Sequence, residues 1–495
     1  MTKALQMKLA CDDTGILSAM QEPPAGYKGL SGFHKYWGKK PTEAWRFLIA
    51  NLTERNDIVL DPFLGSGLIA RECIDLQRRF VGFDINPISI ELTKFYLGLP
   101  NYKDLRNAIE KIEKNLKSII NKMYLLPNGS IATHFLWERD QITKIWTKNG
   151  RNRVEVSLNW DEIERFQNIP QYKPKSLRDL HLFDNSRINA KESFSLADLF
   201  TPRALYAIDL LKEEIEQFDG STKRALLLVL TSSVGQMSNM VFAISKRGKT
   251  KGKEIDRIEV GSWVIGYWRP EQHFEINAWN CFENKARKLL KAVKESGEQK
   301  QIYISDTITD LLRGNGRTYI SLGDSEFLLK YIPSNTIKVI LTDPPHGDRI
   351  PYLELSEIWN SILATDSNYA DELVISNAKE RKKDINNYNK KLNLILAECF
   401  RVLVDNGLIA VMFNARSNDH WNSLNELNKI YKFDYIGCYP MEYSACSVVQ
   451  DNRKGGLKTD FVLLYGKNIS ESSKRDITNT FKNIQGWSTK YPRGA

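Results

Sequence analysis

The residues with the clearest chemical potential form the tetrapeptide Asp343-Pro344-Pro345-His346. It follows an apolar run at residues 337–341, which predicts a buried strand. Two consecutive prolines fix φ and donate no backbone hydrogen bonds, so the chain must leave the sheet as a rigid, extended loop. Such a loop sets a carboxylate, a proline carbonyl and a flat aromatic ring side by side. These groups can accept hydrogen bonds from an exocyclic amino nitrogen while the ring stacks on its base. An ordinary proline-rich turn is the alternative interpretation.

A second candidate group is the heptapeptide Asp61-Pro62-Phe63-Leu64-Gly65-Ser66-Gly67. The apolar residues before it predict a strand, its glycines a tight turn, and residues 68–76 a helix. Glycines at these two positions let the backbone approach a ligand at the carboxyl end of the strand, where open α/β sheets bind ligands. A further strand at residues 80–84 ends in Asp84, whose carboxylate can accept hydrogen bonds from both ribose hydroxyls of a nucleoside. The pattern predicts a βαβ nucleoside-binding unit.

The identity of the nucleoside depends on the acid at the end of the first strand. Gly65-x-Gly67-x-x-Ala70 formally matches the dinucleotide fingerprint, which brings a helix start onto a pyrophosphate. The Asp61 carboxylate would repel a pyrophosphate at that place. It suits the cationic methionyl end of S-adenosylmethionine better. A nicotinamide-dependent oxidoreductase remains a rival interpretation, but it leaves residues 343–346 unexplained.

Both groups of residues resemble the motifs of S-adenosylmethionine-dependent amino-methyltransferases, which methylate adenine N6 or cytosine N4 in DNA. The likeness extends to the upstream Lys40-Pro41 and to Gly323-Asp324-Ser325. The resemblance implies S-adenosylmethionine as cofactor and Asp343, Pro344, Pro345 and His346 as catalytic residues. It also implies a cofactor site that contains Lys40, Pro41, Asp61, Pro62, Phe63, Gly65, Ser66, Gly67, Asp84 and Asp324.

The resemblance also implies a mechanism, in which the Asp343 carboxylate and the Pro344 carbonyl accept hydrogen bonds from the target amino group. These bonds draw the nitrogen lone pair out of conjugation and aim it at the methyl group. The target base is flipped out of the duplex, and His346 stacks on it in place of the commoner Tyr or Phe. Aspartate in the first position leans toward adenine N6, with cytosine N4 as the alternative. Asp324 would lie beside the cofactor adenine, or else it caps the helix that follows it.

The expected fold class is α/β, a seven-stranded Rossmann-like S-adenosylmethionine methyltransferase fold split by a large, mostly helical insertion. We expect a cofactor-binding lobe at residues 1–101, an inserted DNA target-recognition region at 102–317, a catalytic lobe at 318–467 and a polar, peripheral tail at 468–495. The last two strands should form an antiparallel pair, as in the family. The predicted strands are residues 58–61, 80–84, 318–321, 337–341, 408–413, 433–438 and 461–465.

The densest basic run of the chain lies in the expected insertion, at Lys246, Arg247, Lys249, Lys251 and Lys253. Phosphate contacts from such a loop would give salt-sensitive affinity that does not depend on base sequence. A solvated loop with no partner is the alternative. Near the beginning of the chain, His34 and Trp37 are candidate site residues that could equally be core residues.

The composition is that of a soluble globular protein with two or three domains: 495 residues, 42% hydrophobic and 26% charged. The formal net charge of +10 suits a polyanionic partner. Six separated cysteines without a Cys-x-x-Cys spacing, and no apparent signal peptide, predict free thiols in the cytoplasm and no metal site. The sequence has no run of 18 apolar residues, which predicts that no segment spans a membrane. Double-stranded DNA is the expected partner, with a cognate restriction endonuclease as a candidate second partner in restriction-modification or phage defence. The alternatives are a methyltransferase of guanine N2 in tRNA and a non-catalytic nucleic-acid-binding protein with this fold.

Overall fold

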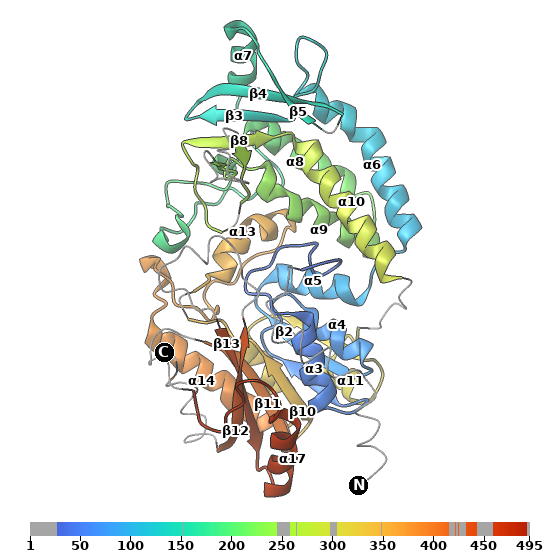
Figure 1. Cartoon of the computed structure of the whole chain (residues 1–495), viewed down its shortest axis with the longest axis vertical. Coiled ribbons are helices and arrows are strands. Elements are labelled where there is room, and N and C mark those ends of the chain that lie inside the picture. The colour runs from blue at the N-terminus through green and yellow to red at the C-terminus, as the bar shows by residue number, and fades with distance from the viewer. Residues whose placement is uncertain are drawn as a thin grey trace.

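The computed structural model describes residues 27–150, 152–244, 258–263, 265–297, 304–347, 349–414, 421, 424, 432–442 and 459–492. The molecule is elongated, with a large α/β part at one end of its long axis and the inserted residues at the other (Figure 1). Within the described ranges, no helix has both the length and the apolar character needed to cross a bilayer.

The larger sheet contains seven strands in the order β12-β13-β11-β10-β1-β2-β9. Its first five strands along the chain pair in parallel, whereas β13 runs antiparallel between β11 and β12. All seven strands expected from the sequence are therefore present, although β11, β12 and β13 are four or five residues longer than expected. Their bounds are β1 (Ile58–Asp61), β2 (Arg79–Asp84), β9 (Thr318–Leu322), β10 (Ile337–Thr342), β11 (Leu403–Phe413), β12 (Phe433–Glu442) and β13 (Thr459–Lys467).

Helices cover both faces of this sheet, because successive side chains of its central strands point to opposite faces and both are apolar. Val59 of β1 packs into one core cluster, and its neighbours Ile58 and Leu60 pack into the other. The first cluster is covered by α3 (Thr42–Leu52), α4 (Leu68–Asp75), α5 (Pro87–Leu97) and α13 (Tyr352–Ile362). The second is covered by α11 (Ile308–Leu312), α12 (Ser325–Leu328) and α14 (Ile385–Val402).

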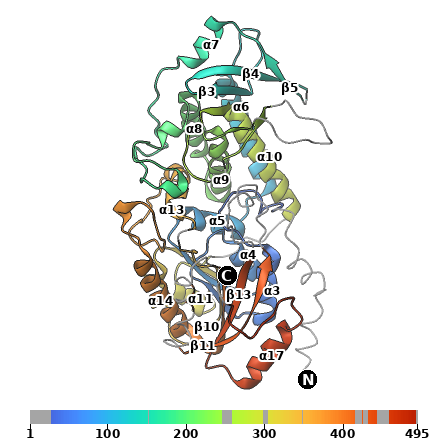
Figure 2. The same cartoon turned by 60° about the vertical axis from the view of Figure 1, so that its left-hand side comes forward.

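The inserted residues form helices and a second sheet, where the sequence predicted a mostly helical region. The helices are α6 (Tyr102–Lys122), α7 (Trp160–Gln167), α8 (Pro202–Ile215), α9 (Gly220–Met237) and α10 (Ala278–Ser296). The sheet has the order β5-β4-β3-β8 and lies at the far end of the molecule (Figure 2). Its strands are β3 (His134–Glu138), β4 (Gln141–Asn149), β5 (Asn152–Val156) and β8 (Gln272–Ile276), and a short pair joins β6 (Ala243–Ile244) to β7 (Glu259–Val260).

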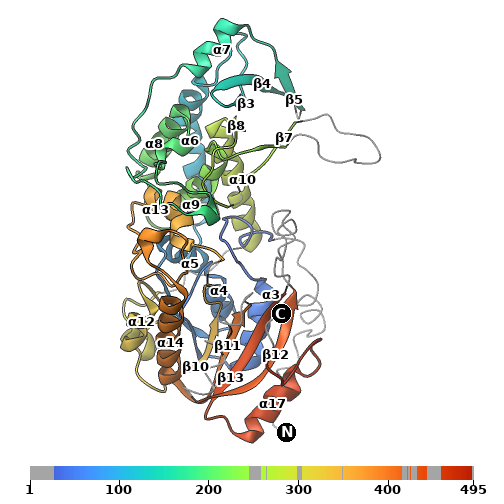
Figure 3. The same ribbon diagram turned by 90° about the vertical axis from the view of Figure 1, so that its left-hand side faces the viewer.

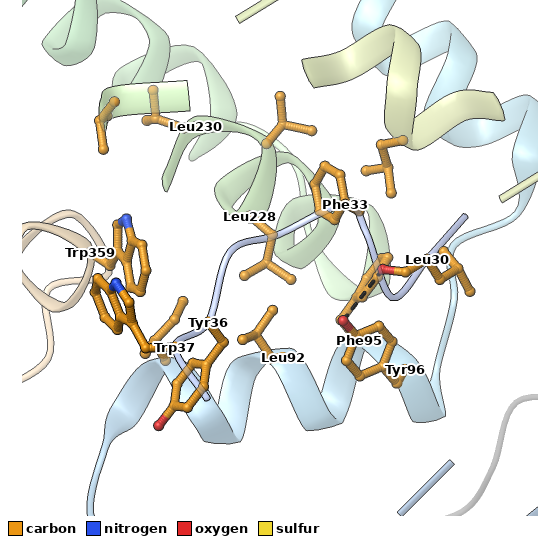
Figure 4. Packing of buried hydrophobic residues seen from close by; sticks show 14 of the residues in the cluster. Leu30, Phe33, Tyr36, Trp37, Leu92, Phe95, Tyr96, Leu228, Leu230 and Trp359 are labelled. Carbon is orange, nitrogen blue, oxygen red and sulfur yellow. Dashed lines mark hydrogen bonds between the residues drawn. The ribbon is translucent and has the colours of Figure 1, made fainter. Parts of the chain in front are cut away.

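The segment at residues 27–41, called here the N-terminal strap, links the two parts of the molecule. Its apolar side chains pack between α5, α9 and α13, with Trp37 stacked on Trp359 at a centroid distance of 4.7 Å (Figure 4). His34 is buried beside them, and its Nε2 lies 3.0 Å from Oγ1 of Thr231 on α9. Burial lowers the pKa of His34 to about 3. His34 is therefore a core residue, which was one of the two interpretations of the sequence, whereas Trp37 is buried and also lines the cavity at the carboxyl ends of β1, β2 and β10.

The residues after Lys467 are not peripheral, contrary to the expectation of a polar tail. They form α17 (Glu471–Phe481), which lies against the α/β part near β12 and β13 (Figure 3). Phe481 is fully buried and stacks on Tyr439 of β12, and it also contacts Phe47 of α3 edge to face. The single buried position Phe481 on this polar helix anchors it to the core.

Candidate active site

A cavity lies at the carboxyl ends of β1, β2 and β10. It encloses about 860 Å³ including its open mouth. The turn after β1, the acid that ends β2 and the loop after β10 all contribute to its wall. The cavity thus joins the two parts of the chain that carry the predicted chemistry. Nine of the predicted site residues line it: Lys40, Asp61, Phe63, Gly65, Ser66, Asp84, Asp324, Asp343 and Pro345. Pro41, Pro62, Gly67, Pro344 and His346 lie next to lining residues in the chain but are not part of the wall.

The two glycines of the turn after β1 have different tasks. Both have positive φ, +51° at Gly65 and +76° at Gly67, a conformation that favours glycine. Gly65 faces the cavity, as expected for a backbone that approaches a ligand. Gly67 instead packs against α5, where an added Cβ would come within 2.3 Å of Oγ1 of Thr93. Gly67 therefore permits close packing of the turn against α5, and its expected approach to a ligand stays a prediction.

Two carboxylates, Asp61 and Asp84, face the cavity from the ends of neighbouring strands. Oδ1 of Asp61 accepts a hydrogen bond from the backbone N–H of Phe63 at 3.0 Å. Asp84 accepts two, from the N–H groups of Gly65 at 2.7 Å and Asn86 at 2.8 Å. Burial raises the pKa of Asp61 well above its usual range and that of Asp84 to about 6. Among the described residues, no Lys or Arg forms an ion pair with either carboxylate.

Asp324 lies at the cavity wall and also begins a helix. Its Oδ1 accepts a hydrogen bond from the N–H of Glu326 at 3.1 Å, so it caps α12, and its Oδ2 pairs with Nζ of Lys391 on α14 at 2.7 Å. Asp324 therefore caps a helix, as one interpretation of the sequence had it, and its place beside the cofactor adenine stays a prediction.

The Asp343-Pro344-Pro345-His346 loop leaves the end of β10 as expected. Hydrogen bonds from Tyr388 Oη and the N–H of Gly347 reach the Pro345 carbonyl. The imidazole of His346 is only 8% exposed, with its Nε2 3.0 Å from Oδ1 of Asp343. Its ring meets Phe413 edge to face. The ring that was expected to stack on a base is therefore engaged within the protein, and its stacking role stays a prediction.

Lys40, expected in the cofactor site, lines the cavity and also pairs with two carboxylates. Its Nζ lies 2.8 Å from Oδ2 of Asp343 and 3.1 Å from Oδ2 of Asp460 on β13. Burial raises the pKa of Asp343, but the Lys40 ammonium and the hydrogen bond with His346 outweigh burial and hold that pKa below its usual range. Asp343 is therefore a carboxylate at neutral pH.

Sequence reasoning did not identify Asp460, Tyr36 or Tyr352 as parts of the site. Asp460 is an acid at the beginning of an apolar strand, and nothing in its neighbourhood indicates that it meets the loop after β10. Tyr36 and Tyr352 stack on each other at 5.7 Å and line the cavity, and Tyr36 Oη accepts a hydrogen bond from Ser89 Oγ at 2.9 Å. The tyrosine at 36, within the aromatic segment Phe33 to Trp37, was the one signal in the sequence for this wall.

Two further expectations concern other kinds of site. The basic run Lys246, Arg247, Lys249, Lys251 and Lys253 lies outside the described residues. Within the described part of the chain, no three His, Cys, Asp or Glu side chains are grouped so that they could hold a metal ion.

Comparisons with known proteins show that the first lobe is similar to DNA methylases. Residues 16–95 match the N6_N4_Mtase family model, which is described as DNA methylase. The type II methyltransferase M.MjaII of Methanocaldococcus jannaschii is 26% identical over 422 residues, which cover 79% of this chain and 73% of that protein. M.HpaI of Haemophilus parainfluenzae is 28% identical over 141 residues, 28% of this chain and 41% of that protein. M.XycI of Xanthomonas campestris pv. cyanopsidis is 44% identical over 68 residues, 14% of this chain and 23% of that protein.

Solved structures give weaker likenesses. A putative DNA modification methylase from Thermus thermophilus, complexed with S-adenosyl-L-methionine, has a TM-score of 0.18 at 14% identity, over 30% of this chain and 52% of that one. The rRNA methyltransferase aviRa of Streptomyces viridochromogenes has a TM-score of 0.24 at 11% identity, over 95% of this chain and 96% of that one. TM-scores this low support no conclusion about fold or substrate. The sequence matches confirm the resemblance to DNA amino-methyltransferases and, with it, S-adenosylmethionine as the expected cofactor.

Proposed function

We propose, from the resemblance to the N6/N4 DNA methylases, that this protein transfers a methyl group from S-adenosylmethionine to an exocyclic amino group of a flipped base in DNA. Adenine N6 is the favoured target and cytosine N4 the alternative. The observation that carries the proposal is the shared cavity: Gly65 and Asp84 line it together with Asp343, although 259 residue positions separate Asp84 from Asp343.

The cavity suits a cationic nucleoside. Asp84 retains acceptor capacity for ribose hydroxyls, because each carboxylate oxygen has more lone pairs than the one backbone bond uses. Asp61 is buried and has no cation beside it in the described structure, so the methionyl ammonium of the cofactor would stabilise its charged form. Asp324 would lie toward the adenine. When bound there, the cofactor supplies an electrophilic methyl group on a sulfonium centre.

The catalytic proposal assigns orientation and hydrogen bonding to the loop after β10. The Asp343 carboxylate and the Pro344 carbonyl would accept hydrogen bonds from the target amino group, localise its lone pair and direct it toward the methyl carbon. Within the described residues, no hydrogen bond occupies the Pro344 carbonyl oxygen. The low pKa of Asp343 supports this role, because a carboxylate accepts such bonds without a competing proton.

DNA is the proposed polyanionic partner. The insertion would contact the duplex, and the basic run from Lys246 to Lys253 would contribute phosphate contacts. Extruding the target base costs a few kcal/mol, which binding to the cavity and the DNA backbone must offset. The relatives' designation as type II methyltransferases supports a role in restriction-modification, in which a cognate endonuclease would be a further partner.

Methyl transfer from labelled S-adenosylmethionine tests the proposal directly. The purified protein is incubated with duplex DNA or with tRNA, and labelled nucleic acid is digested to nucleosides to identify the methylated base. We expect label in DNA, as N6-methyladenine. Asp343→Ala should reduce transfer at least 10³-fold, about 4 kcal/mol, while binding of S-adenosylmethionine survives.

Asp476→Ala is the matched control, because this carboxylate is exposed on α17, outside the cavity wall. Its activity should equal that of the wild type. Label in tRNA alone would favour the guanine-N2 alternative. Cofactor binding without transfer to either substrate would indicate a non-catalytic binder. Full turnover by Asp343→Ala would reject the catalytic assignment.

A further inference from the structure

A chain of five polar side chains runs from the loop after β10 into the interior. Nδ1 of His346 lies 2.9 Å from Nη1 of Arg349, and its Nε2 lies 3.0 Å from Oδ1 of Asp343. On the other side of Asp343, Lys40 bridges to Asp460 with ion-pair distances of 2.8 and 3.1 Å. Nη1 of Arg349 lies 3.7 Å from Oδ1 of Asp460, which closes the chain into a ring. Both oxygens of Asp343 thereby have a partner.

Three distant segments must meet to build this ring. Lys40 lies near the end of the N-terminal strap, just before α3, and Asp343 directly follows β10. Asp460 is near the beginning of β13, next to Phe461, which pairs with Phe413 at the carboxyl end of β11. Since β13 runs antiparallel to β11, its first residues lie at the same edge of the sheet as the loop after β10. The antiparallel last strand is thus what brings a second carboxylate to the site.

The charges in the ring are balanced, and burial makes that balance energetically important. The side chains of Lys40 and Asp460 are 3% and 1% exposed. Buried charges are costly unless they are paired, and removing one partner of a buried pair is strongly destabilising. Two carboxylates share the Lys40 ammonium, and the Arg349 guanidinium offsets the second negative charge. The Lys40 ammonium also donates to the Gly38 carbonyl oxygen at 3.4 Å, so each of its three donors has a partner within the protein.

We propose that Lys40 and Asp460 form a positioning pair that holds Asp343 in its working orientation and in its charged form, and that Lys40 is not a ligand of the cofactor. This inference rests on the proposed methyl transfer and deepens it. It assigns a task to Asp460, which the motifs leave out, and changes the task that the motifs suggest for Lys40.

Variants that remove a charge test the proposal, because it fixes the direction in which the pKa of Asp343 must shift. Groups that face Asp343 are Lys40, His346 in its own loop, Asp61 on β1 and Tyr388 on α14. An adjacent opposite charge lowers the pKa of an aspartate by about one to three pH units. Lys40→Met should therefore raise the pKa of Asp343, and the single-turnover rate should acquire an acidic limb about one to three pH units above that of the wild type.

The double variant Lys40→Met/Asp460→Asn provides the sharper comparison. It removes the like charge that Lys40→Met leaves beside Asp343, so its acidic limb should lie below that of the single variant. It also replaces a buried ion pair by two neutral groups, which protects the test if the single variant folds poorly. Lys40→Arg should restore a profile close to that of the wild type. Affinity for S-adenosylmethionine, from titration calorimetry, should stay within about twofold in all three variants, because none of these substitutions alters a side chain that binds the cofactor.

Two results would overturn the inference: a tenfold or larger loss of cofactor affinity in Lys40→Met, or acidic limbs that coincide in the wild type and in both Met variants. A wild type that methylates neither DNA nor tRNA would instead contradict the proposed function. The positioning pair would then be tested without an activity assay, by measuring the unfolding midpoint as a function of pH. The deficit of Lys40→Met relative to the wild type should shrink as pH falls, because its uncompensated carboxylates take up protons in the folded state. A deficit independent of pH would contradict the pair.

Discussion

Replacement of the two glycines in the turn after β1 should separate packing from ligand contact within one motif. An alanine at either position adopts positive φ, which costs about 1–2 kcal/mol. At Gly67 the added Cβ also lies 2.3 Å from Oγ1 and 2.9 Å from Cα of Thr93, and such overpacking typically costs about 1–3 kcal/mol more. At Gly65 the nearest atom, Cε1 of Tyr36, is 3.5 Å away, an ordinary contact.

We therefore expect Gly67→Ala to lower the free energy of unfolding by about 2–5 kcal/mol, and Gly65→Ala by about 1–2 kcal/mol. Guanidinium denaturation followed by circular dichroism measures both losses, and titration calorimetry measures affinity for S-adenosylmethionine. For affinity for S-adenosylmethionine, the two variants should rank the other way round. Gly65→Ala should weaken binding, because this residue lines the cavity, whereas the folded fraction of Gly67→Ala should bind normally.

Thr93→Ala supplies the matched control for the packing argument. Combined with Gly67→Ala, it removes the 2.3 Å contact but leaves the 2.9 Å approach to the backbone Cα, so the double variant should regain part of the lost stability. Equal stability losses at the two glycines, or no recovery in the double variant, would refute the assignment of Gly67 to helix packing.

Two further predictions follow from buried charges. Arg381 bridges Glu354 and Glu372 at 2.5 and 2.7 Å. Arg381→Met leaves these two buried carboxylates without a cation, so it should lower the free energy of unfolding by about 3–5 kcal/mol. A loss below about 1 kcal/mol in denaturant titration would contradict this. Asp84 has a pKa of about 6 because it is buried, so affinity for S-adenosylmethionine should fall as the pH drops through that value and the carboxylate gains a proton. Calorimetry across that range measures the fall, and Asp84→Asn should bind weakly with little dependence on pH.

Local patterns in the sequence were sufficient to predict the seven strands of the larger sheet and nine of the residues that line the cavity. The apolar runs before Asp61 and Asp343 form adjacent parallel strands, β1 and β10, and the residues after them meet in one cavity. This worked because a buried parallel strand is a short apolar run, and its carboxyl end is where a ligand site must lie. The four-stranded sheet of the insertion was not found, because β8 joins β3 from a distant part of the chain and no local period encodes that pairing.

The sequence by itself determined which residue types stand at the ends of the strands, and hence the class of chemistry. Only the tertiary structure decided their partners. Lys40, expected in the cofactor site, lines the cavity and also joins Asp343 to Asp460, and Gly67 packs closely against α5. The physical reason is that a residue's type and spacing specify what it can bond to, whereas the charge it meets depends on strands and loops brought together from distant parts of the chain.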